Sequence, residues 1–352
     1  MAALEGGALV WHRNFGIADA ETQTSVTDDS LFEAASTSKP VFAYVALQLV
    51  ERGELDLDRP LAMYHRPPYL PADARLDKIT ARHALTHSSG LRNWGNEGEP
   101  DSFRPMFEPG ARVSYSGEAI FWLQLVTERI TGLGLDVLMR KFLFAPAGMN
   151  NSMFAVDSGA MDRLVYGHTS GRRARQQGMR DILAPIAPLA TQWNKPIRDW
   201  SHEDWLHAAA TLDPDHPTQR VRFQNAASSL VTTASDYARF LTLMMDGAPR
   251  AAWQISERLR REMLTPTLAI QPGATLWRGI GWSLEECAGE MRFGHEGNND
   301  GRCTAFVGGE AKRGRGLVIL TNADAGFGVY QRIVRAATGS DQLSFIANLS
   351  PP

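Results

Sequence analysis

The sequence predicts an α+β fold: an antiparallel sheet built from both ends of the chain and flanked by helices, with a mainly α-helical region inserted. Three observations predict this architecture. Residues 3–18 alternate like a β-hairpin, residues 57–216 combine prolines with short helical patterns, and residues 279–322 form short β-rich runs between glycine-rich turns. We therefore expect an α/β domain from residues 1–56 and 217–352, and a mainly helical domain from residues 57–216.

The first elements follow from local patterns. Residues 8–13 alternate after a turn at residues 5–7, which predicts the hairpin. Residues 36–52 are predicted to form a long helix, because apolar residues recur at a spacing of three or four and cover every face. A helix that is apolar all round is buried, and Gly53 is expected to end it.

The later elements are shorter. Residues 157–216 are the least regular part, with arginines, tryptophans and prolines that are typical of a lid or pocket wall. A solvated loop with a few packed aromatic residues is the alternative. Further helices are predicted over residues 118–131, 135–143, 233–245 and 330–337. Short strands are predicted over residues 279–284, 291–295, 304–308 and 317–322.

The composition narrows the classes of partner. A formal net charge of -3 argues against nucleic acid or an anionic membrane as the main partner. No apolar run reaches the ~18 residues of a membrane span. The first residues lack the basic and apolar regions of a signal peptide, so the sequence as written predicts a cytoplasmic protein, or a periplasmic or secreted one if a leader was removed. The two cysteines, Cys287 and Cys303, are expected to stay reduced.

The first candidate for chemistry is the pair Ser36 and Lys39. Residues three apart on a helix share a face, so the serine hydroxyl and the lysine amine can meet. A serine hydroxyl needs a base to become a nucleophile, and a buried lysine can serve when burial lowers its pKa. An S-x-x-K sequence also occurs by chance, with a surface serine beside a solvated lysine. The apolar helix that follows favours burial of Lys39.

Two further segments carry polar groups suited to acyl transfer. Tyr115, after a turn at residues 108–110, could relay a proton, although a packed loop aromatic is the alternative. Residues 294–301 hold four glycines among small polar residues, which predicts a tight crossing between strands with room for a substrate. A backbone N–H there could form half of an oxyanion hole, while a hairpin with a surface histidine is the alternative.

These three segments, in this order and spacing, resemble the S-x-x-K, Y-x-N and K-T-G elements of the serine β-lactamase and penicillin-binding protein superfamily. The class C β-lactamase-like branch, which includes family VIII carboxylesterases, is the most similar. Four supporting stretches match phrases typical of that branch: residues 47–57, 84–91, 107–110 and 225–232. The resemblance covers about residues 1–340, breaks down over residues 157–216, and implies a β-lactamase/DD-peptidase-like fold.

The resemblance implies a role for each matching residue. Ser36 would be the acylated nucleophile, Lys39 its general base, and Tyr115 the group that delivers a proton to the leaving group. The oxyanion hole would be formed by the backbone N–H groups of Ser36 and of Asn298, just past Gly297.

Two positions depart from the family pattern. Gly117 replaces the Y-x-N asparagine, and His295 replaces the K-T-G lysine. Both changes weaken recognition of an anionic acyl-amide substrate and favour an ester, because an alkoxide leaves more easily than an amine.

We therefore expect a serine esterase that acts on a small-molecule ester or amide, without a metal or another cofactor. A β-lactamase, a D-amino-acid peptidase and an acyltransferase on the same scaffold are the alternatives, together with a binding module that has no turnover. His83 and His87 have the spacing of a zinc site, but no glutamate follows His83, so a structural role is expected for both.

Overall fold

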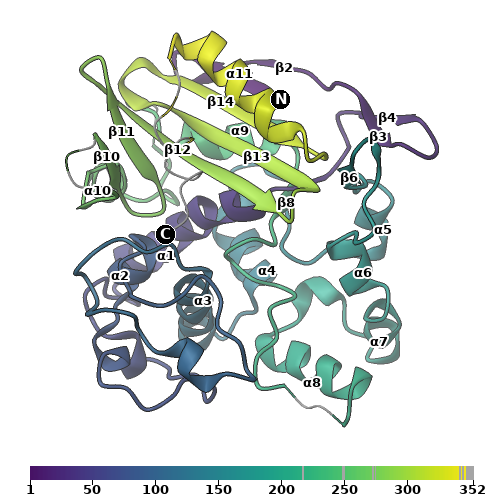
Figure 1. The fold of residues 1–352 in the computed structure, drawn as a ribbon, viewed down its shortest axis with the longest axis vertical. Helices are drawn as coiled ribbons and strands as arrows, with labels where there is room; N and C mark the ends of the chain where they lie inside the picture. Colours follow the sequence, from purple (N-terminus) through teal and green to yellow (C-terminus); the bar gives the residue numbers. More distant parts are fainter. Residues whose placement is uncertain are drawn as a thin grey trace.

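An eight-stranded antiparallel sheet forms the centre of the computed structural model, which describes residues 1–215, 218–247, 250–271, 273, 275–340, 342 and 345. The strand order is β2-β1-β14-β13-β12-β11-β10-β9 (Figure 1). The strands are β1 (Ala2–Glu5), β2 (Ala8–His12), β9 (Leu268–Ala269), β10 (Leu276–Arg278), β11 (Ser283–Cys287), β12 (Glu290–Asn299), β13 (Cys303–Glu310) and β14 (Arg315–Thr321). β1 pairs with β14, so the two ends of the chain meet in one sheet, as predicted.

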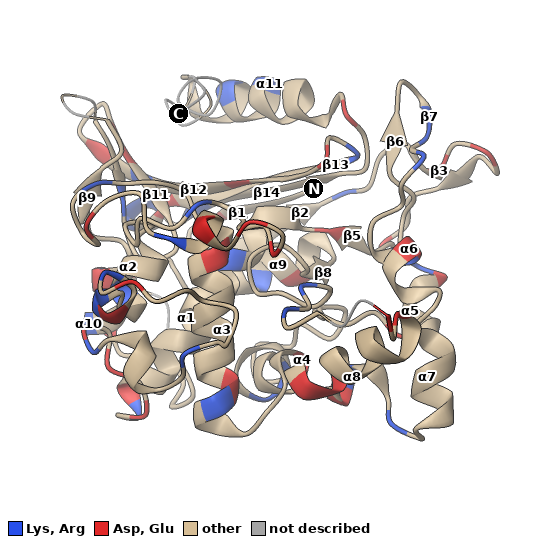
Figure 2. Cartoon of the chain, turned by 60° about the horizontal axis from the view of Figure 1, so that its bottom comes forward, with Lys and Arg blue, Asp and Glu red and all other residues tan. Residues whose placement is uncertain are grey.

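Helices cover both faces of this sheet. In Figure 2, α11 (Gly326–Thr338) lies above the sheet, and α1 (Ser38–Glu51) and α9 (Ala234–Thr242) lie below it. The side chains divide accordingly, because neighbours along a strand point to opposite faces. Phe306 of β13 packs toward α11 with Tyr330, whereas Ala305 and Val307 belong to the large core on the other face. The α+β class predicted from the sequence is confirmed.

The helix that follows residue 36 is buried on all sides, as its apolar composition predicts. Every residue of α1 from Ser38 to Leu49 is buried. Gly53, at φ +71°, follows the end of this helix in the left-handed region that glycine adopts without strain. α1 therefore fixes the position of residues 36–39 within the core.

The segment before residue 216 is more regular than expected. Four α-helices lie between residues 157 and 215, and a second hydrophobic core gathers around Trp200 and Trp205. The sequence pattern missed this because each helix is short and its apolar residues come in clusters rather than at a long period. The remaining helices are α2 (Ala81–Leu85), α3 (Gly117–Thr131), α4 (Leu135–Met139), α5 (Ser158–Met161), α6 (Met179–Leu183), α7 (Ala187–Gln192), α8 (His202–Leu212) and α10 (Glu257–Met263). Short two-stranded pairs are formed by β3 (Ile17–Asp19) with β4 (Thr24–Ser25), β5 (Phe32–Glu33) with β8 (Val231–Thr232), and β6 (His168–Thr169) with β7 (Arg172–Arg173).

Two strand predictions are wrong in detail. Residues 279–282 form the turn between β10 and β11 rather than a strand, with the Gly279 N–H donating to the Trp282 carbonyl at 2.9 Å. Conversely, residues 294–299, predicted to be a tight crossing, are the second half of the long strand β12. Glycine usually marks a turn, but in β12 it allows close approach of a neighbouring segment, as the site shows.

The division into two domains stays a prediction. The largest hydrophobic core contains residues from both parts, including Trp122 of α3 and Trp282 next to β11, and the expected boundary falls on residues 216–217, outside the described part of the chain. Cys287 and Cys303 are both free thiols. Within the described residues, no helix is long and apolar enough to cross a membrane.

Candidate active site

Ser36 lies in a short 3-10 turn, η1 (Ala35–Thr37), that leads directly into α1. Residues three apart face the same side of such a turn. The Nζ of Lys39 accordingly lies 3.1 Å from the Oγ of Ser36, and it also donates a hydrogen bond to the Ala227 carbonyl at 2.8 Å. The structure thus brings the predicted pair into contact, although Ser36 precedes α1 instead of beginning it.

Lys39 is an amine buried without a counter-ion. Its side chain is 2% exposed, and no carboxylate of the described residues lies within 4.0 Å of Nζ. Burial, and secondly the positive charge of Arg278, hold the pKa of Lys39 well below its usual value. These causes favour the neutral amine, which is the form that can accept a proton from Ser36.

Gly297 allows strand β12 to pass directly against the turn that carries Ser36. A Cβ atom at Gly297 would lie 2.6 Å from the Ala34 carbonyl oxygen and 3.1 Å from the Ala35 Cβ. Ala35 itself has φ +49°, a strained value for a residue other than glycine, immediately before the nucleophile. The close approach brings the end of β12 next to Ser36. The oxyanion hole formed by the N–H groups of Ser36 and Asn298 stays a prediction.

Tyr115 lies against the lysine. The Nζ of Lys39 is 4.6 Å from the centre of the Tyr115 ring. Burial raises the pKa of Tyr115 to about 12, while an interaction with the Ser36 side chain and the charge of Arg278 act in the opposite direction. The phenol is therefore protonated at neutral pH and can act as an acid. Ser116 holds this loop by capping α3, where its Oγ accepts a hydrogen bond from the Ala119 N–H at 3.0 Å.

His295 is buried and neutral rather than a surface histidine. Its ring lies 6.2 Å from that of Tyr115. The Nδ1 atom is 2.7 Å from the Glu296 carbonyl, which can only accept, so Nδ1 carries the proton and the unpartnered Nε2 is an acceptor. Burial, followed by the charges of Lys39 and Arg278, holds the pKa of His295 well below its usual value. His295 therefore does not supply the cation of the K-T-G lysine.

Two residues that the sequence analysis did not place in the site complete the group around Tyr115: His87, for which a structural role was expected, and Arg278. The His87 ring is 4.3 Å from that of Tyr115, and its Nδ1 accepts a hydrogen bond from the Ser116 N–H at 3.1 Å. Arg278 has its guanidinium carbon 5.7 Å from the Tyr115 ring. His87 lies within residues 84–91, one of the stretches that match the family, so the sequence could have indicated that it belongs to the site. Arg278 lies in no such stretch, and an isolated arginine in a strand does not by itself indicate a site.

Arg278 is a buried cation with few partners. Its Nη1 donates to the Ser283 Oγ at 2.6 Å, its Nε is without a partner, and no carboxylate of the described residues lies within 4.0 Å. Burial lowers the pKa of Arg278, yet arginine stays charged in proteins. It is thus the permanent positive charge among Lys39, His87 and His295, and it favours the neutral form of each.

The space that an asparagine would occupy at position 117 is filled by an aromatic ring. A Cβ atom at Gly117 would lie 2.5 Å from a ring carbon of Trp94. The Gly117 N–H instead donates to the Oδ1 of Asn93 at 2.9 Å. An amide side chain therefore reaches the site from residue 93, a neighbour in space that the Y-x-N spacing could not indicate.

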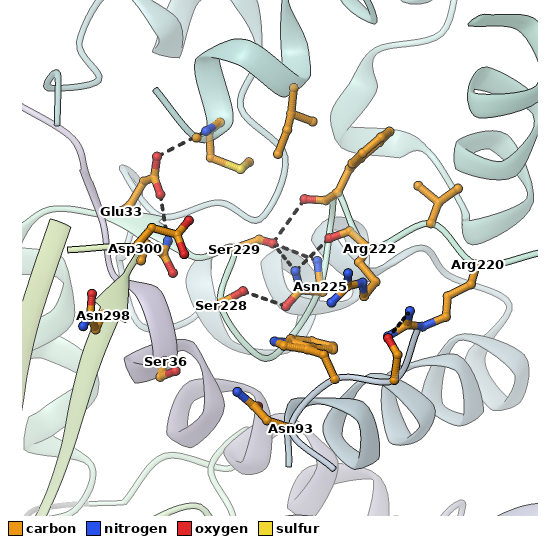
Figure 3. Close-up of a pocket in the computed structure, with 18 of the residues that line it drawn as sticks. Glu33, Ser36, Asn93, Arg220, Arg222, Asn225, Ser228, Ser229, Asn298 and Asp300 are labelled. Carbon is orange, nitrogen blue, oxygen red and sulfur yellow. Dashed lines mark hydrogen bonds between the residues drawn. The ribbon is translucent and has the colours of Figure 1, made fainter. Parts of the chain in front are cut away.

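A cavity opens beside Ser36 and Lys39. It has a volume of about 760 Å³ and is shown in Figure 3. Its walls come from residues 93–97, 178–182, 218–229 and 298–302. Residues 157–216 were expected to form a lid or pocket wall, and residues 178–182 of that segment do line the cavity. The walls from residues 93–97 and 218–229 come from outside that segment.

Within the described part of the chain, no group of three or more histidine, cysteine, aspartate or glutamate residues is placed to hold a metal ion. The absence of a cofactor stays a prediction.

The fold and this constellation define the class: a serine hydrolase of the penicillin-recognising kind. The chain belongs to the family described as Beta-lactamase, whose profile matches residues 1–339. The predicted resemblance to the serine β-lactamase and penicillin-binding protein superfamily is thereby confirmed.

Named relatives include both esterases and penicillin-binding proteins. The chain is 32% identical to Esterase EstB of Burkholderia gladioli over 176 residues, which cover 42% of this chain and only 44% of that protein. It is 26% identical to Penicillin-binding protein 4 of Amycolatopsis lactamdurans over 351 residues, covering 94% of this chain and 80% of that protein. The structure of D-alanine carboxypeptidase AmpC from Burkholderia cenocepacia superposes with a TM-score of 0.69 at 20% identity, covering 92% of this chain and 87% of the other. This structural likeness shows the shared β-lactamase/DD-peptidase-like fold.

Proposed function

We propose that the protein hydrolyses carboxylic esters through an acyl-enzyme on Ser36. The observation that carries the proposal is the buried amine of Lys39, held 3.1 Å from the Ser36 Oγ with no carboxylate of the described residues within 4.0 Å. A lysine that is kept neutral in this way can serve as a general base for serine. Burying a lysine without a carboxylate partner costs free energy of folding, so a purely structural role does not explain it.

The reaction follows from these positions. Lys39 takes the hydroxyl proton as the Ser36 Oγ attacks the ester carbonyl, and the tetrahedral oxyanion lies between the N–H groups of Ser36 and Asn298. Tyr115, protonated at neutral pH, gives its proton to the departing alkoxide oxygen and regains one from Lys39. The carbonyl–alkoxide bond breaks as the acyl–Oγ bond is completed. In the second half of the reaction, Lys39 takes a proton from a water molecule as its oxygen attacks the acyl carbonyl. The acyl–Oγ bond then breaks, the proton passes from Lys39 to the Ser36 Oγ, and the carboxylic acid is released.

The choice of an ester rests on position 117 and on the relatives. Trp94 excludes an asparagine at Gly117, so the amide contact of the Y-x-N element is missing at its usual position. Esterase EstB and Lovastatin esterase of Penicillium rubens, the latter 30% identical over 185 residues and 42% of this chain, carry esterase in their names. An ester also requires less assistance to the leaving group than an amide does.

Arg278 favours a second candidate function. The loss of the K-T-G lysine leaves this site with a buried cation beside Tyr115, on the side where the leaving group departs. Such a cation would attract a carboxylate on the leaving group, as in a β-lactam or a peptide ending in a free carboxylate. β-Lactamase or peptidase activity is therefore the alternative, and hydrolysis of nitrocefin and of D-alanyl peptides faster than that of aryl esters would establish it.

The proposal is tested by labelling the nucleophile. Intact-protein mass spectrometry after treatment with a fluorophosphonate is expected to show one adduct on Ser36, and Ser36→Ala is expected to lose both the adduct and the hydrolysis of p-nitrophenyl butyrate. Ser25→Ala, which alters an exposed serine of β4, serves as the control and keeps both. Full esterase activity in Ser36→Ala would overturn the assignment.

A further inference from the structure

The cavity extends from Ser36 in the direction away from Tyr115, which is proposed to protonate the leaving group of the substrate. Ser36 and Lys39 line it, whereas Tyr115, His295 and Arg278 do not. In the proposed reaction the leaving oxygen must lie next to the Tyr115 hydroxyl. The remaining direction, into the cavity, is the one available to the acyl part of the substrate. This step rests on the proposed function.

The basic residues that line this cavity differ in how their charges are neutralised. Arg302 pairs with Glu33 at 3.3 Å and with Asp300 at 2.8 Å. Arg220 is buried and bound by both carboxylate oxygens of Glu118. These two guanidinium groups connect the walls of the cavity, and carboxylates of the protein neutralise their charges.

Arg222 is different. Its guanidinium carbon lies 4.6 Å from the Trp94 ring, and no carboxylate of the described residues lies within 4.0 Å of it. The Asn225 Nδ2 donates to the Arg222 carbonyl at 2.8 Å and so fixes the backbone from which the side chain projects. This contact with the Trp94 ring holds the guanidinium at one wall of the cavity, and the residue stays exposed to solvent.

A second donor lies on the same side of the cavity. The Asn93 Oδ1 accepts the hydrogen bond from the Gly117 N–H, which leaves its Nδ2 without a partner among the described residues. Figure 3 shows Asn93 and Arg222 on the side of the cavity opposite Asn298 and Asp300. The wall thus presents an amide N–H and an unpaired guanidinium.

Two acidic groups compete for this cation: Glu118, whose carboxylate already binds Arg220, and Glu97. Glu97 also lines the cavity, but it is exposed, and its carboxylate accepts hydrogen bonds from the Thr218 hydroxyl at 2.8 and 2.9 Å. Its charge weakens the attraction of an anion to Arg222 without forming an ion pair with it.

We propose that Arg222, supported by Trp94 and Asn93, forms a subsite for a carboxylate carried by the acyl part of the substrate. The preferred substrates are then half-esters of dicarboxylic acids, whose far carboxylate reaches the guanidinium while the near carbonyl lies at Ser36. A planar carboxylate matches the donor geometry of a guanidinium.

The test compares charged and neutral acyl chains of equal length. The 4-nitrophenyl monoesters of adipate, pimelate and suberate are measured against the hexanoate, heptanoate and octanoate esters, with the enzyme-free rate subtracted. We expect kcat/KM to favour the acidic ester at one chain length. That ratio should fall about fivefold in Arg222→Met, recover in Arg222→Lys, and decline as salt is added. Arg258→Met removes an equal charge from α10, outside the cavity, and should leave the ratio unchanged.

Glu97→Gln provides a test that does not disturb Arg222. Removing this competing charge should raise the ratio about twofold. If both ester series are hydrolysed and neither Arg222→Met nor Glu97→Gln changes the ratio, the carboxylate subsite is wrong while ester hydrolysis stands. If the wild-type protein hydrolyses neither series, the proposed function itself fails.

Discussion

At the scale of single residues, the site is a cluster of basic groups held neutral by burial and by one permanent charge. Lys39, His87 and His295 all have pKa values well below their usual range, with burial as the first cause and Arg278 contributing to each. These surroundings increase the deprotonated fraction of Lys39 at neutral pH, which is the form that can act as a general base. The cost is a set of polar groups buried without full partners, such as the Nε2 of His295.

The first prediction concerns the pH dependence of activity. Lys39 acts only when deprotonated, so kcat/KM falls on the acid side as Lys39 gains a proton. Arg278 lowers the pKa of Lys39, and Arg278→Met should therefore move the acid limb of the profile to higher pH. Arg278→Lys keeps the charge and should keep the limb close to its wild-type position. A fall in kcat/KM without any shift of the limb would contradict this role. The other groups near Lys39 are Tyr115 and the two histidines, which are unchanged in both variants.

The second prediction concerns stability. The pKa of Lys39 is lower in the folded protein than in the unfolded chain, so between these two values the unfolded chain binds one more proton and stability rises with pH. Lys39→Met removes this dependence. Relative to the variant, the wild-type protein should therefore lose stability as the pH falls from 9 to 6, by at most ~1.4 kcal/mol per pH unit. Urea unfolding of both proteins across that range measures the difference, and a constant difference would mean that Lys39 is charged in the folded state.

Part of the site could be predicted from residues alone. Ser36 and Lys39 are close in sequence, so their contact follows from local geometry. Tyr115 and His295 were reached through the spacing of family motifs. Asn93 and Arg278 could not be predicted, because each reaches the site through a tertiary contact with a segment that is distant in the sequence. Local sequence patterns do not indicate such contacts.

At the scale of elements, the approach of strand β12 to the turn η1 determines the geometry around Ser36. Gly297 permits it, because a Cβ atom there would lie 2.6 Å from the Ala34 carbonyl oxygen. The sequence pattern predicted a turn here because glycine and small polar residues usually mark turns. The same residues instead let a strand lie closer to its neighbour than side chains would allow.

The third prediction tests this contact. Gly297→Ala should destabilise the fold by about 1–3 kcal/mol and lower kcat, because the added methyl group pushes β12 away from Ala34 and Ser36. Gly328→Ala is the matched control. Its new Cβ meets nothing within 4 Å inside α11, and alanine is the better helix former, so stability should stay equal or rise. Chemical denaturation and initial rates measure the two effects. Wild-type stability and kcat in Gly297→Ala would show that β12 can shift without consequence.

At the scale of the whole molecule, buried ion pairs connect segments that lie far apart in the sequence. Glu118 at the start of α3 binds Arg220 from the cavity wall and accepts a hydrogen bond from the Gly95 N–H at 3.1 Å. Both side chains of the pair are almost fully buried. One carboxylate thus joins the helix that follows Tyr115 to two walls of the cavity.

The last prediction follows from this position. Glu118→Gln leaves the Arg220 charge buried without compensation, which should cost about 3–5 kcal/mol of the free energy of unfolding. It should also loosen residues 93–97 and 218–223, and so reduce the discrimination between acidic and neutral acyl chains more than the rate with a short neutral ester. Glu5→Gln breaks an exposed pair with Arg315 at the sheet edge and should change stability by less than ~0.5 kcal/mol. Urea denaturation of both variants, together with the ester series, separates the two effects. Equal stability losses in the two variants would mean that the buried pair does not hold the walls together, whereas a loss confined to Glu118→Gln would show that the cavity and the fold depend on the same contact.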